Sequence, residues 1–466
     1  MSIHADQRQH EVETAVEQQL KQARAAAEMS FEQMIAQCQT PGISVAVIDE
    51  GRVAWCAGYG VRQYGQPERV TTETPFQAAS ISKPTATLGV LRMAEAGVLD
   101  LDEDVHERLK SWHLPAVNDV MPRITPRMLV SHSAGLSVHG FIGYTVEQPQ
   151  PTLPDILDGT GLHVTSEPVR LINLPGLTYD YSGGGYTLLQ LWLENVTGES
   201  FSSLMQRWVL EPLGMTHSAF VQPPTPEFAA RCASGHYYDG LTIRGGWHVY
   251  PELAAAGLWT TPSDLAILTL AIQAAHRGEH PLISKHTADL MLTPHIPMSE
   301  AGQFRALGFQ VQRVGGSQYF SHNGSNAGFR CHLNASADDG RGCIVMTNGE
   351  GEWTRKIIAW FADAIMQAYA WPATQTEPAQ ADRSFDPAVT GQYKLGDQLI
   401  SIELEAGTLK IRMPDQPIMA LCQTDAATFQ VEGLATIIRF GVVSAEQPPQ
   451  AMTIEQIGRT LTAYRV

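Results

Sequence analysis

The fold and the chemistry of the chain follow from one stretch, residues 74–83, with the sequence TPFQAASISK. A run rich in helix-forming residues comes next, over 84–96, and its start places Ser80 and Lys83 at a helix N-terminus. Residues three apart lie on the same face of a helix, so the hydroxyl and the amine would lie side by side. A neutral amine in that position can take the proton of the hydroxyl and make its oxygen a nucleophile. Because S-x-x-K often occurs by chance, the rest of the chain has to supply the partners of this pair.

The composition describes an acidic protein that is large enough for more than one domain. It has 466 residues, of which 44% are hydrophobic, and this length suggests about two or three domains. Acidic residues outnumber Lys and Arg by 48 to 31, which makes the net charge -17. Phosphate binding needs a basic surface, so we expect no nucleic-acid partner.

The cysteines and the apolar segments bear on the compartment. Six cysteines stand singly along the chain: Cys38, Cys56, Cys232, Cys331, Cys343 and Cys422. Without a C-x-x-C pair or a dense framework, they are typical of small buried residues in a reducing compartment. The chain starts with polar and charged residues rather than the apolar core of a signal peptide. No stretch approaches the roughly 18 uninterrupted apolar residues of a membrane span. We therefore expect a cytoplasmic protein with no membrane partner.

Hydrophobic periodicity divides the first 370 residues into recognisable elements. We expect a helix over 7–37 and a hairpin of core strands over 42–61, followed by a helical middle. Strands of one antiparallel sheet should lie between 309 and 347, before a last helix over 353–370. We expect the N-terminal helix to cap this domain, and a homo-oligomer formed through it stays open.

The composition and the hydrophobic pattern of the chain change after residue 370. Residues 371–385 are rich in Pro, Ala and Gln and lack an apolar period, as a linker does. Short alternating strands follow over 386–466, which predicts a small β domain, barrel-like in form. The predicted domains are therefore 1–370 and 386–466.

Two further motifs follow Ser80 in a recognisable order. Tyr181-Ser182-Gly183 precedes a helical run, and His322-Asn323-Gly324 ends a predicted strand. The order of an S-x-x-K, a Tyr motif and a strand with a basic residue and Gly resembles that of the serine β-lactamases and penicillin-binding proteins. Class A members of that superfamily use S-x-x-K, S-D-N and K-T-G.

Longer segments resemble the class C β-lactamase-related serine hydrolases, a family of esterases, D-amino-acid peptidases, carboxypeptidases and acyltransferases. They are 124–136 (ITPRMLVSHSAGL), 175–186, 256–266 (AGLWTTPSDLA) and 322–329 (HNGSNAGF). The resemblance covers roughly residues 38 to 370. It implies an α+β fold with an antiparallel sheet flanked by helices, a helical lobe, and the site between them. The segment from 386 resembles the lipocalin-like C-terminal domain that some members carry.

The resemblance also implies a role for each matching residue. Ser80 would be the nucleophile that accepts the acyl group, and Lys83 its general base. Tyr181 would shuttle protons and help to activate the deacylating water. His322 takes the place of the Lys of K-T-G and could hydrogen-bond Tyr181 or the developing charge. The backbone N–H groups of Ser80 and Ser325 would form the oxyanion hole.

One position departs from the family pattern, which is usually Y-x-N. The third residue here is Gly183, which lacks the amide that supports the Lys and contacts the substrate. Asn323 or Asn326 could compensate, and with Gly183 and Gly324 they are the residues we assign to substrate binding. The departure weakens the case for a specificity that depends on this amide contact, but it leaves the nucleophile, the base and the hole.

The remaining histidines do not predict a metal site. His139, His236 and His248 are scattered and lack acidic or Cys partners at ligand spacing, and His132 matches a structural position of the family. We expect no metal and no organic cofactor.

The sequence thus predicts a hydrolase that cleaves an ester or amide bond of a small ester or peptide through an acyl-enzyme on Ser80. Acyl transfer, a peptidase that prefers D-residues, and an inactive binding protein on the same scaffold stay open. The loops 137–170 and 220–255 would shape the substrate pocket.

Overall fold

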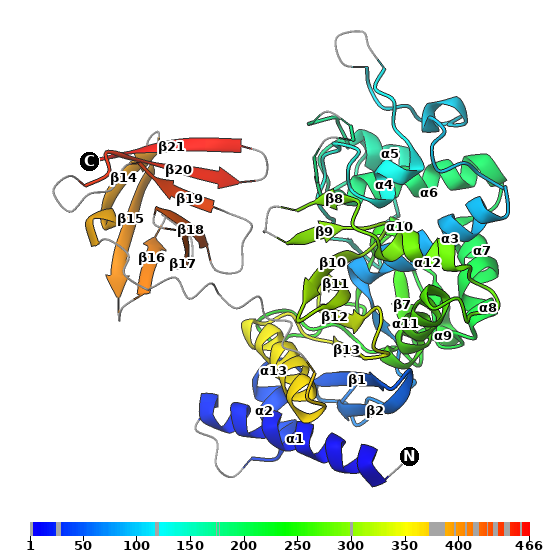
Figure 1. Cartoon of the computed structure of the whole chain (residues 1–466), viewed down its shortest axis with the longest axis horizontal. Coiled ribbons are helices and arrows are strands. Elements are labelled where there is room, and N and C mark those ends of the chain that lie inside the picture. Colours follow the sequence, from blue (N-terminus) through cyan, green and yellow to red (C-terminus); the bar gives the residue numbers. More distant parts are fainter. Residues whose placement is uncertain are drawn as a thin grey trace. The chain divides into compact units, whose positions relative to one another are not determined.

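The chain folds into two compact units that divide between residues 373 and 374 (Figure 1). The computed structural model describes residues 3–24, 29–116, 121–173, 175–176, 178–298, 302–371, 387–395, 398–405, 408–412, 419–425, 427–431, 437–441, 448–456 and 459–466. The division falls within the predicted linker 371–385, most of which lies outside the described residues. Trp371, at its start, is 8% exposed and packs in the core of the first unit.

The first unit is built on an eight-stranded antiparallel sheet in the order β2-β1-β13-β12-β11-β10-β9-β8. Its strands are β1 (Gly42–Asp49), β2 (Arg52–Gly60), β8 (Ile296–Pro297), β9 (Gln303–Arg305), β10 (Gln310–Val314), β11 (Ser317–Asn326), β12 (Phe329–Ser336) and β13 (Gly342–Thr347). The predicted hairpin is β1 and β2, and the strands expected between 309 and 347 are β10 to β13. The central strand β13 is buried at every position, because both faces of the sheet are covered.

Three helices cover one face of the sheet: α1 (Ile3–Arg24), α2 (Phe31–Gln37) and α13 (Glu352–Ala368) (Figure 1). They pack on Val45 and Val47 of β1, whereas Ala46 and Ile48 of the same strand belong to the core on the other face. The single helix expected over 7–37 is therefore wrong. A second helix starts at Ser30, whose side chain accepts from the Gln33 amide while the Gln33 side chain accepts from the Ser30 amide.

The other face carries the helical lobe. Its elements are η1 (Ala79–Ile81), α3 (Ser82–Glu95), η2 (Val105–Glu107), α4 (Pro126–Val130), α5 (Leu153–Asp158), α6 (Gly183–Thr197), α7 (Phe201–Met205), the π-helical turn η3 (Gln206–Leu210), α8 (Glu211–Leu213), α9 (Pro226–Ala229), α10 (Leu253–Ala256), α11 (Pro262–His276) and α12 (Lys285–Leu292). Helix α4 begins with the Thr125 side chain accepting from the Met128 amide and with Pro126 in the first turn.

Short strands connect the loops of the lobe. Strands β3 (Phe76–Gln77), β7 (Leu258–Thr260) and β5 (Ala219–Phe220) form a three-stranded sheet in that order. Strands β4 (Tyr144–Thr145) and β6 (His248–Val249) pair with each other. The two loops that we expect to shape the pocket, 137–170 and 220–255, are thus joined through β4 and β6.

The second unit is a closed barrel whose eight antiparallel strands pair in chain order. They are β14 (Gly391–Leu395), β15 (Gln398–Glu405), β16 (Thr408–Arg412), β17 (Met419–Asp425), β18 (Thr428–Val431), β19 (Ile437–Phe440), β20 (Ala451–Gln456) and β21 (Arg459–Arg465), with a short turn, η4 (Pro387–Val389), before them. The predicted β domain is confirmed, and its up-and-down order is the arrangement found in lipocalins.

Candidate active site

Ser80 lies on the turn that leads into α3. It occupies η1, and between residues 74 and 83 only Ser80 keeps partial exposure while its neighbours are buried. Ala79, just before it, has a φ of 49°, which non-glycine residues rarely adopt. Ser82, the other hydroxyl of the motif, is fully buried, donates to the Ala79 carbonyl and accepts from the Leu258 amide. The accessible hydroxyl is therefore that of Ser80.

Lys83 points its amine at Ser80. Its Nζ lies 3.0 Å from Ser80 Oγ and donates to the Ala255 carbonyl at 2.8 Å. The side chain is 2% exposed. Burial, and after it the positive charge of Arg305, lowers the pKa of Lys83 from 10.5 to about 7. A large share of Lys83 is thus neutral near pH 7, as a base for Ser80 has to be.

Tyr181 supplies the second partner of Ser80. Its hydroxyl hydrogen-bonds the Ser80 side chain, and Lys83 Nζ lies 5.0 Å from the centre of its ring. Burial raises the pKa of Tyr181, and the Ser80 hydrogen bond and the Arg305 charge oppose that rise. The structure thus brings Ser80, Lys83 and Tyr181 together.

Two histidines hold the Tyr181 ring between them. The His132 ring stacks on it at 4.2 Å between centroids and 25° between planes, and the His139 ring lies 4.6 Å away on a tilt of 37°. The Nδ1 of His132 accepts from the Ser182 amide, which joins this stack to the cap of α6. His132 therefore orients Tyr181, in keeping with the structural role expected for it. His139 was not assigned to the site from the sequence.

His322 enters the site from β11 as a neutral side chain. Burial, followed by the charges of Arg305 and Lys83, holds the pKa of His322 well below 6.5. Its Nδ1 lies 2.8 Å from the Asn323 carbonyl, while its buried Nε2 has no hydrogen-bond partner among the described residues. Its ring centre is 6.3 Å from that of Tyr181. The hydrogen bond to Tyr181 that the sequence suggested is therefore not made.

Strand β11 lies directly against the turn that carries Ser80. A Cβ atom on Gly324 would overlap the Ala78 carbonyl oxygen, so this approach requires glycine. Ser325 follows on the exposed side of the strand, with its backbone next to this contact. The oxyanion hole expected from the amides of Ser80 and Ser325 stays a prediction.

The loop 139–141 occupies the space beside Gly183. A Cβ on Gly183 would lie 3.1 Å from the His139 carbonyl and from the Phe141 ring, and the Gly183 amide donates to that same carbonyl. An Asn side chain at this position would displace the loop. Lys83 is held from another direction, by the Ala255 carbonyl.

The two candidate asparagines of β11 make other contacts. Asn323 Oδ1 lies 2.7 Å from His332 Nδ1 on the exposed side of the strand. The Asn326 amide is buried and donates to Gln77 Oε1 and to the Ala256 carbonyl. Neither side chain bonds Lys83 in the structure, so neither takes over that part of the role of the family Asn.

The sequence offered no signal for two contributors to the site. Ala255 acts through its backbone carbonyl, which no motif records. Arg305 stands in QFRALGF without a recognisable pattern, yet it is 4% exposed and donates from Nη2 to Tyr179 Oη at 2.9 Å. Both residues come to the site only through the fold.

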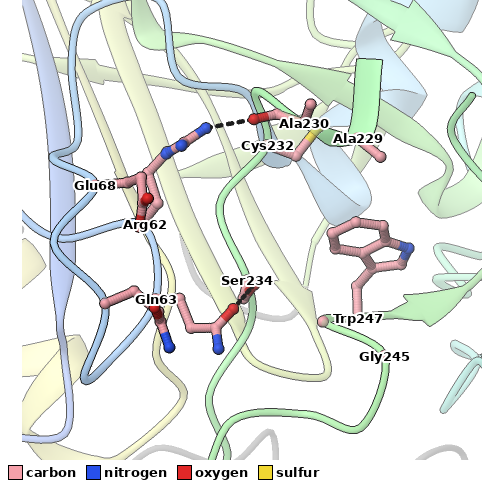
Figure 2. Close-up of a pocket in the computed structure, with 11 residues that line it drawn as sticks. Arg62, Gln63, Glu68, Ala229, Ala230, Cys232, Ser234, Gly245 and Trp247 are labelled. Carbon is pink, nitrogen blue, oxygen red and sulfur yellow. Dashed lines mark hydrogen bonds between the residues drawn. The ribbon is translucent and has the colours of Figure 1, made fainter. Parts of the chain in front are cut away.

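A separate cavity of about 310 Å³ lies among the loops next to β2 (Figure 2). Arg62, Glu68 and Trp247 are among its lining residues, and none of Ser80, Lys83, Tyr181 and His322 lines it. The described residues contain no cluster of three His, Cys, Asp or Glu side chains that could hold a metal ion. In the part of the chain that the structure describes, no helix is long and apolar enough to cross a membrane.

Comparison with known proteins shows what this site is similar to. A curated relative, "Protein flp" of Staphylococcus aureus (strain N315), is 28% identical over 228 residues, which cover 48% of this chain and 42% of the relative. The match thus spans less than half of that relative's length. Among solved structures, "SurE with D-Leu" has a TM-score of 0.61 at 20% identity, over 94% of this chain and 97% of SurE. EstCE1, described as "a hydrolase with promiscuous acyltransferase activity", has a TM-score of 0.58 at 23% identity, over 78% and 100%.

The two structural similarities establish the fold that the resemblance implied. The family follows from a comparison of the sequence itself. The family model described as "Beta-lactamase" matches residues 24–367, which is most of the chain and spans Ser80, Tyr181 and His322. The chain belongs to the beta-lactamase family.

Proposed function

We propose that the protein cleaves an ester or amide bond of a small ester or peptide through an acyl-enzyme on Ser80. The observation that carries the proposal is the contact of 3.0 Å between Lys83 Nζ and Ser80 Oγ, with the Tyr181 hydroxyl bonded to the same serine. A buried lysine that is neutral near pH 7 beside an accessible hydroxyl is the arrangement an activated nucleophile needs.

Acylation begins when neutral Lys83 takes the Ser80 proton as Oγ attacks the carbonyl carbon. The carbonyl oxygen becomes an oxyanion, which the amides of Ser80 and Ser325 stabilise by hydrogen bonds. The proton then passes through the Tyr181 hydroxyl to the leaving alcohol or amine, and the bond between carbon and leaving group breaks. The acyl group stays on Ser80 Oγ, and Lys83 is neutral again.

Deacylation repeats these steps with water. Tyr181 and Lys83 take a proton from the water as it attacks the acyl carbon, and the oxyanion forms again in the same hole. Collapse of this intermediate releases the acid and returns the proton to Ser80. Neutral His322, whose buried Nε2 has no partner among the described residues, lies beside Tyr181 with 6.3 Å between the ring centres.

Two alternatives use the same acyl-enzyme. An alcohol or amine in place of water would give acyl transfer, and EstCE1 is described as having such activity. A peptidase with a preference for D-residues is the other, and SurE was solved with D-Leu. An amide substrate gains little from position 183, because Gly183 has no side chain to contact it. A binding protein on this scaffold would not need a neutral Lys83 beside Ser80.

A substrate panel tests the proposal and separates the alternatives. The purified chain is incubated with p-nitrophenyl esters and with D- and L-aminoacyl p-nitroanilides, and Ser80→Ala is the matched control. We expect ester cleavage that Ser80→Ala abolishes. Cleavage of D-anilides alone would favour the peptidase, and new esters or amides formed with added alcohol or amine would favour acyl transfer. Equal rates for the native chain and Ser80→Ala would refute the proposal.

A further inference from the structure

Arg305 is a buried cation that nothing in the described part of the chain neutralises. Its side chain is 4% exposed, and no salt bridge joins it to a described carboxylate. Nη2 donates to Tyr179, but Nε and Nη1 are buried without a hydrogen-bond partner. Arginine stays protonated in proteins, and an uncompensated buried charge is costly. A function of the charge explains the burial of Arg305 better than side-chain packing does.

The Arg305 guanidinium lies close enough to Lys83 and Tyr181 for its charge to affect the ionisation of both proton-transfer residues. Its Cζ is 5.6 Å from the centre of the Tyr181 ring, and Lys83 Nζ is 5.0 Å from the same point. The two cations are therefore within about 11 Å of each other, and like charges at that separation shift a pKa by about one unit at an effective dielectric constant near 20. A positive charge there favours neutral Lys83 and ionised Tyr181.

The other groups around Lys83 do not supply a fixed positive charge. The groups that face it are Ser80 on η1, Tyr181 before α6, Tyr186 within α6, His132 after α4, His139 in the following loop, His322 on β11 and Arg305 on β9. Burial and neighbouring cations lower the pKa of His132, His139 and His322. These three histidines are therefore mostly neutral near pH 7.

The resemblance places a lysine where this chain has His322, and neutral His322 cannot provide the charge of that lysine. We propose that Arg305, from a different strand, is the positive charge of this active site. It acts as a positioning residue whose charge favours neutral Lys83 and opposes the effect of burial on Tyr181, and it touches neither substrate nor Ser80. The inference rests on the proposed function, because it assigns Arg305 to the proton transfers of the Ser80 acyl-enzyme.

The test is the pH dependence of Ser80 acylation by a fluorophosphonate, followed by intact mass so that turnover is not needed. Arg305→Met removes the charge and keeps most of the side-chain length. Tyr179→Phe removes the hydroxyl that holds Nη2 and leaves both charge and nucleophile in place. Because Arg305→Met removes an uncompensated buried charge, we expect its thermal midpoint to equal or exceed that of the native chain.

We expect the acidic limb of the native profile near pH 7 and that of Arg305→Met about one unit higher. Acylation of Arg305→Met at pH 6 would then be about tenfold slower than native, with little difference at pH 9. Tyr179→Phe should keep the native limb. An unmoved limb in Arg305→Met, an equal displacement in Tyr179→Phe, or loss of labelling at every pH in Arg305→Met would overturn the inference. Failure of the native chain to label at Ser80 would instead refute the proposed function.

Discussion

Glu252 is a buried acid on the segment that holds Lys83, and its replacement by Gln tests how that segment is stabilised. The residue is 0% exposed and directly precedes α10, whose Ala255 carbonyl accepts from Lys83. Tyr144 donates to Oε1, while Oε2 is buried without a partner among the described residues. Burial raises the pKa of Glu252 from 4.5 to about 8.

The sign of the effect follows from proton binding. Between pH 4.5 and about 8 the folded state holds a proton on Glu252 that the unfolded state has lost, so stability falls as pH rises through this window. Each pH unit in this window lowers the free energy of unfolding by about 1.4 kcal/mol. The loss is about 3 kcal/mol at pH 7 and about 5 kcal/mol above pH 8. Gln at this position stays neutral and does not incur the cost. Any constant effect of its amide on packing or hydrogen bonding cancels in the slope of stability against pH.

Urea unfolding of the native chain and Glu252→Gln at several pH values measures that slope. All nine tryptophans precede residue 372, so tryptophan fluorescence reports on the first unit alone. We expect the stability difference between variant and native chain to grow by about 1.4 kcal/mol per pH unit between pH 5 and 7.5 and then to level off. Parallel curves for the two proteins would refute the reasoning.

Three further predictions concern the proton path and the turn around Ser80. Acylation of the native chain should fall about tenfold per unit below pH 7 as Lys83 gains a proton, and a stopped-flow pH profile with its acidic limb above pH 9 would contradict this. Ser82→Ala should keep labelling at Ser80 but unfold more easily by about 1–3 kcal/mol, since two buried groups lose a partner; urea titration measures the difference. Gly324→Ala should slow acylation by about a hundredfold, because β11 has to move away from Ala78, and an unchanged single-turnover rate would argue against this placement of the strand.

Local patterns in the sequence carried much of the fold. The hairpin over 42–61 and the strands between 309 and 347 could be predicted from their β-branched and apolar residues, and Thr125 marks the start of α4. The short strands β8 and β9 were not predicted. The three glycines that open α6 are poor helix formers. The Ser182 cap and the carbonyls of Val138 and His139, which accept from Gly184 and Gly183, hold that first turn in the structure.

The barrel and the site also depend on contacts that local sequence patterns do not predict. Strand β21 alternates polar and apolar residues only weakly, and the barrel closes through its pairing with β14, a contact between residues far apart in the chain. Within the site, Ser80, Lys83 and Tyr181 follow from motifs. The Ala255 carbonyl and the Arg305 charge belong to residues that are far from Ser80 in the sequence. No spacing in the sequence predicts that the fold brings this carbonyl and this cation to Lys83.

The most direct test of the account is the identity of the residue that a fluorophosphonate labels, and a β-lactam in parallel reports whether that acyl donor is accepted. Intact mass and peptide mapping are compared for the native chain, Ser80→Ala and Ser82→Ala. We expect one adduct, on Ser80, in the native chain and in Ser82→Ala, and none in Ser80→Ala. An adduct that persists in Ser80→Ala, or that maps to Ser82, would contradict it.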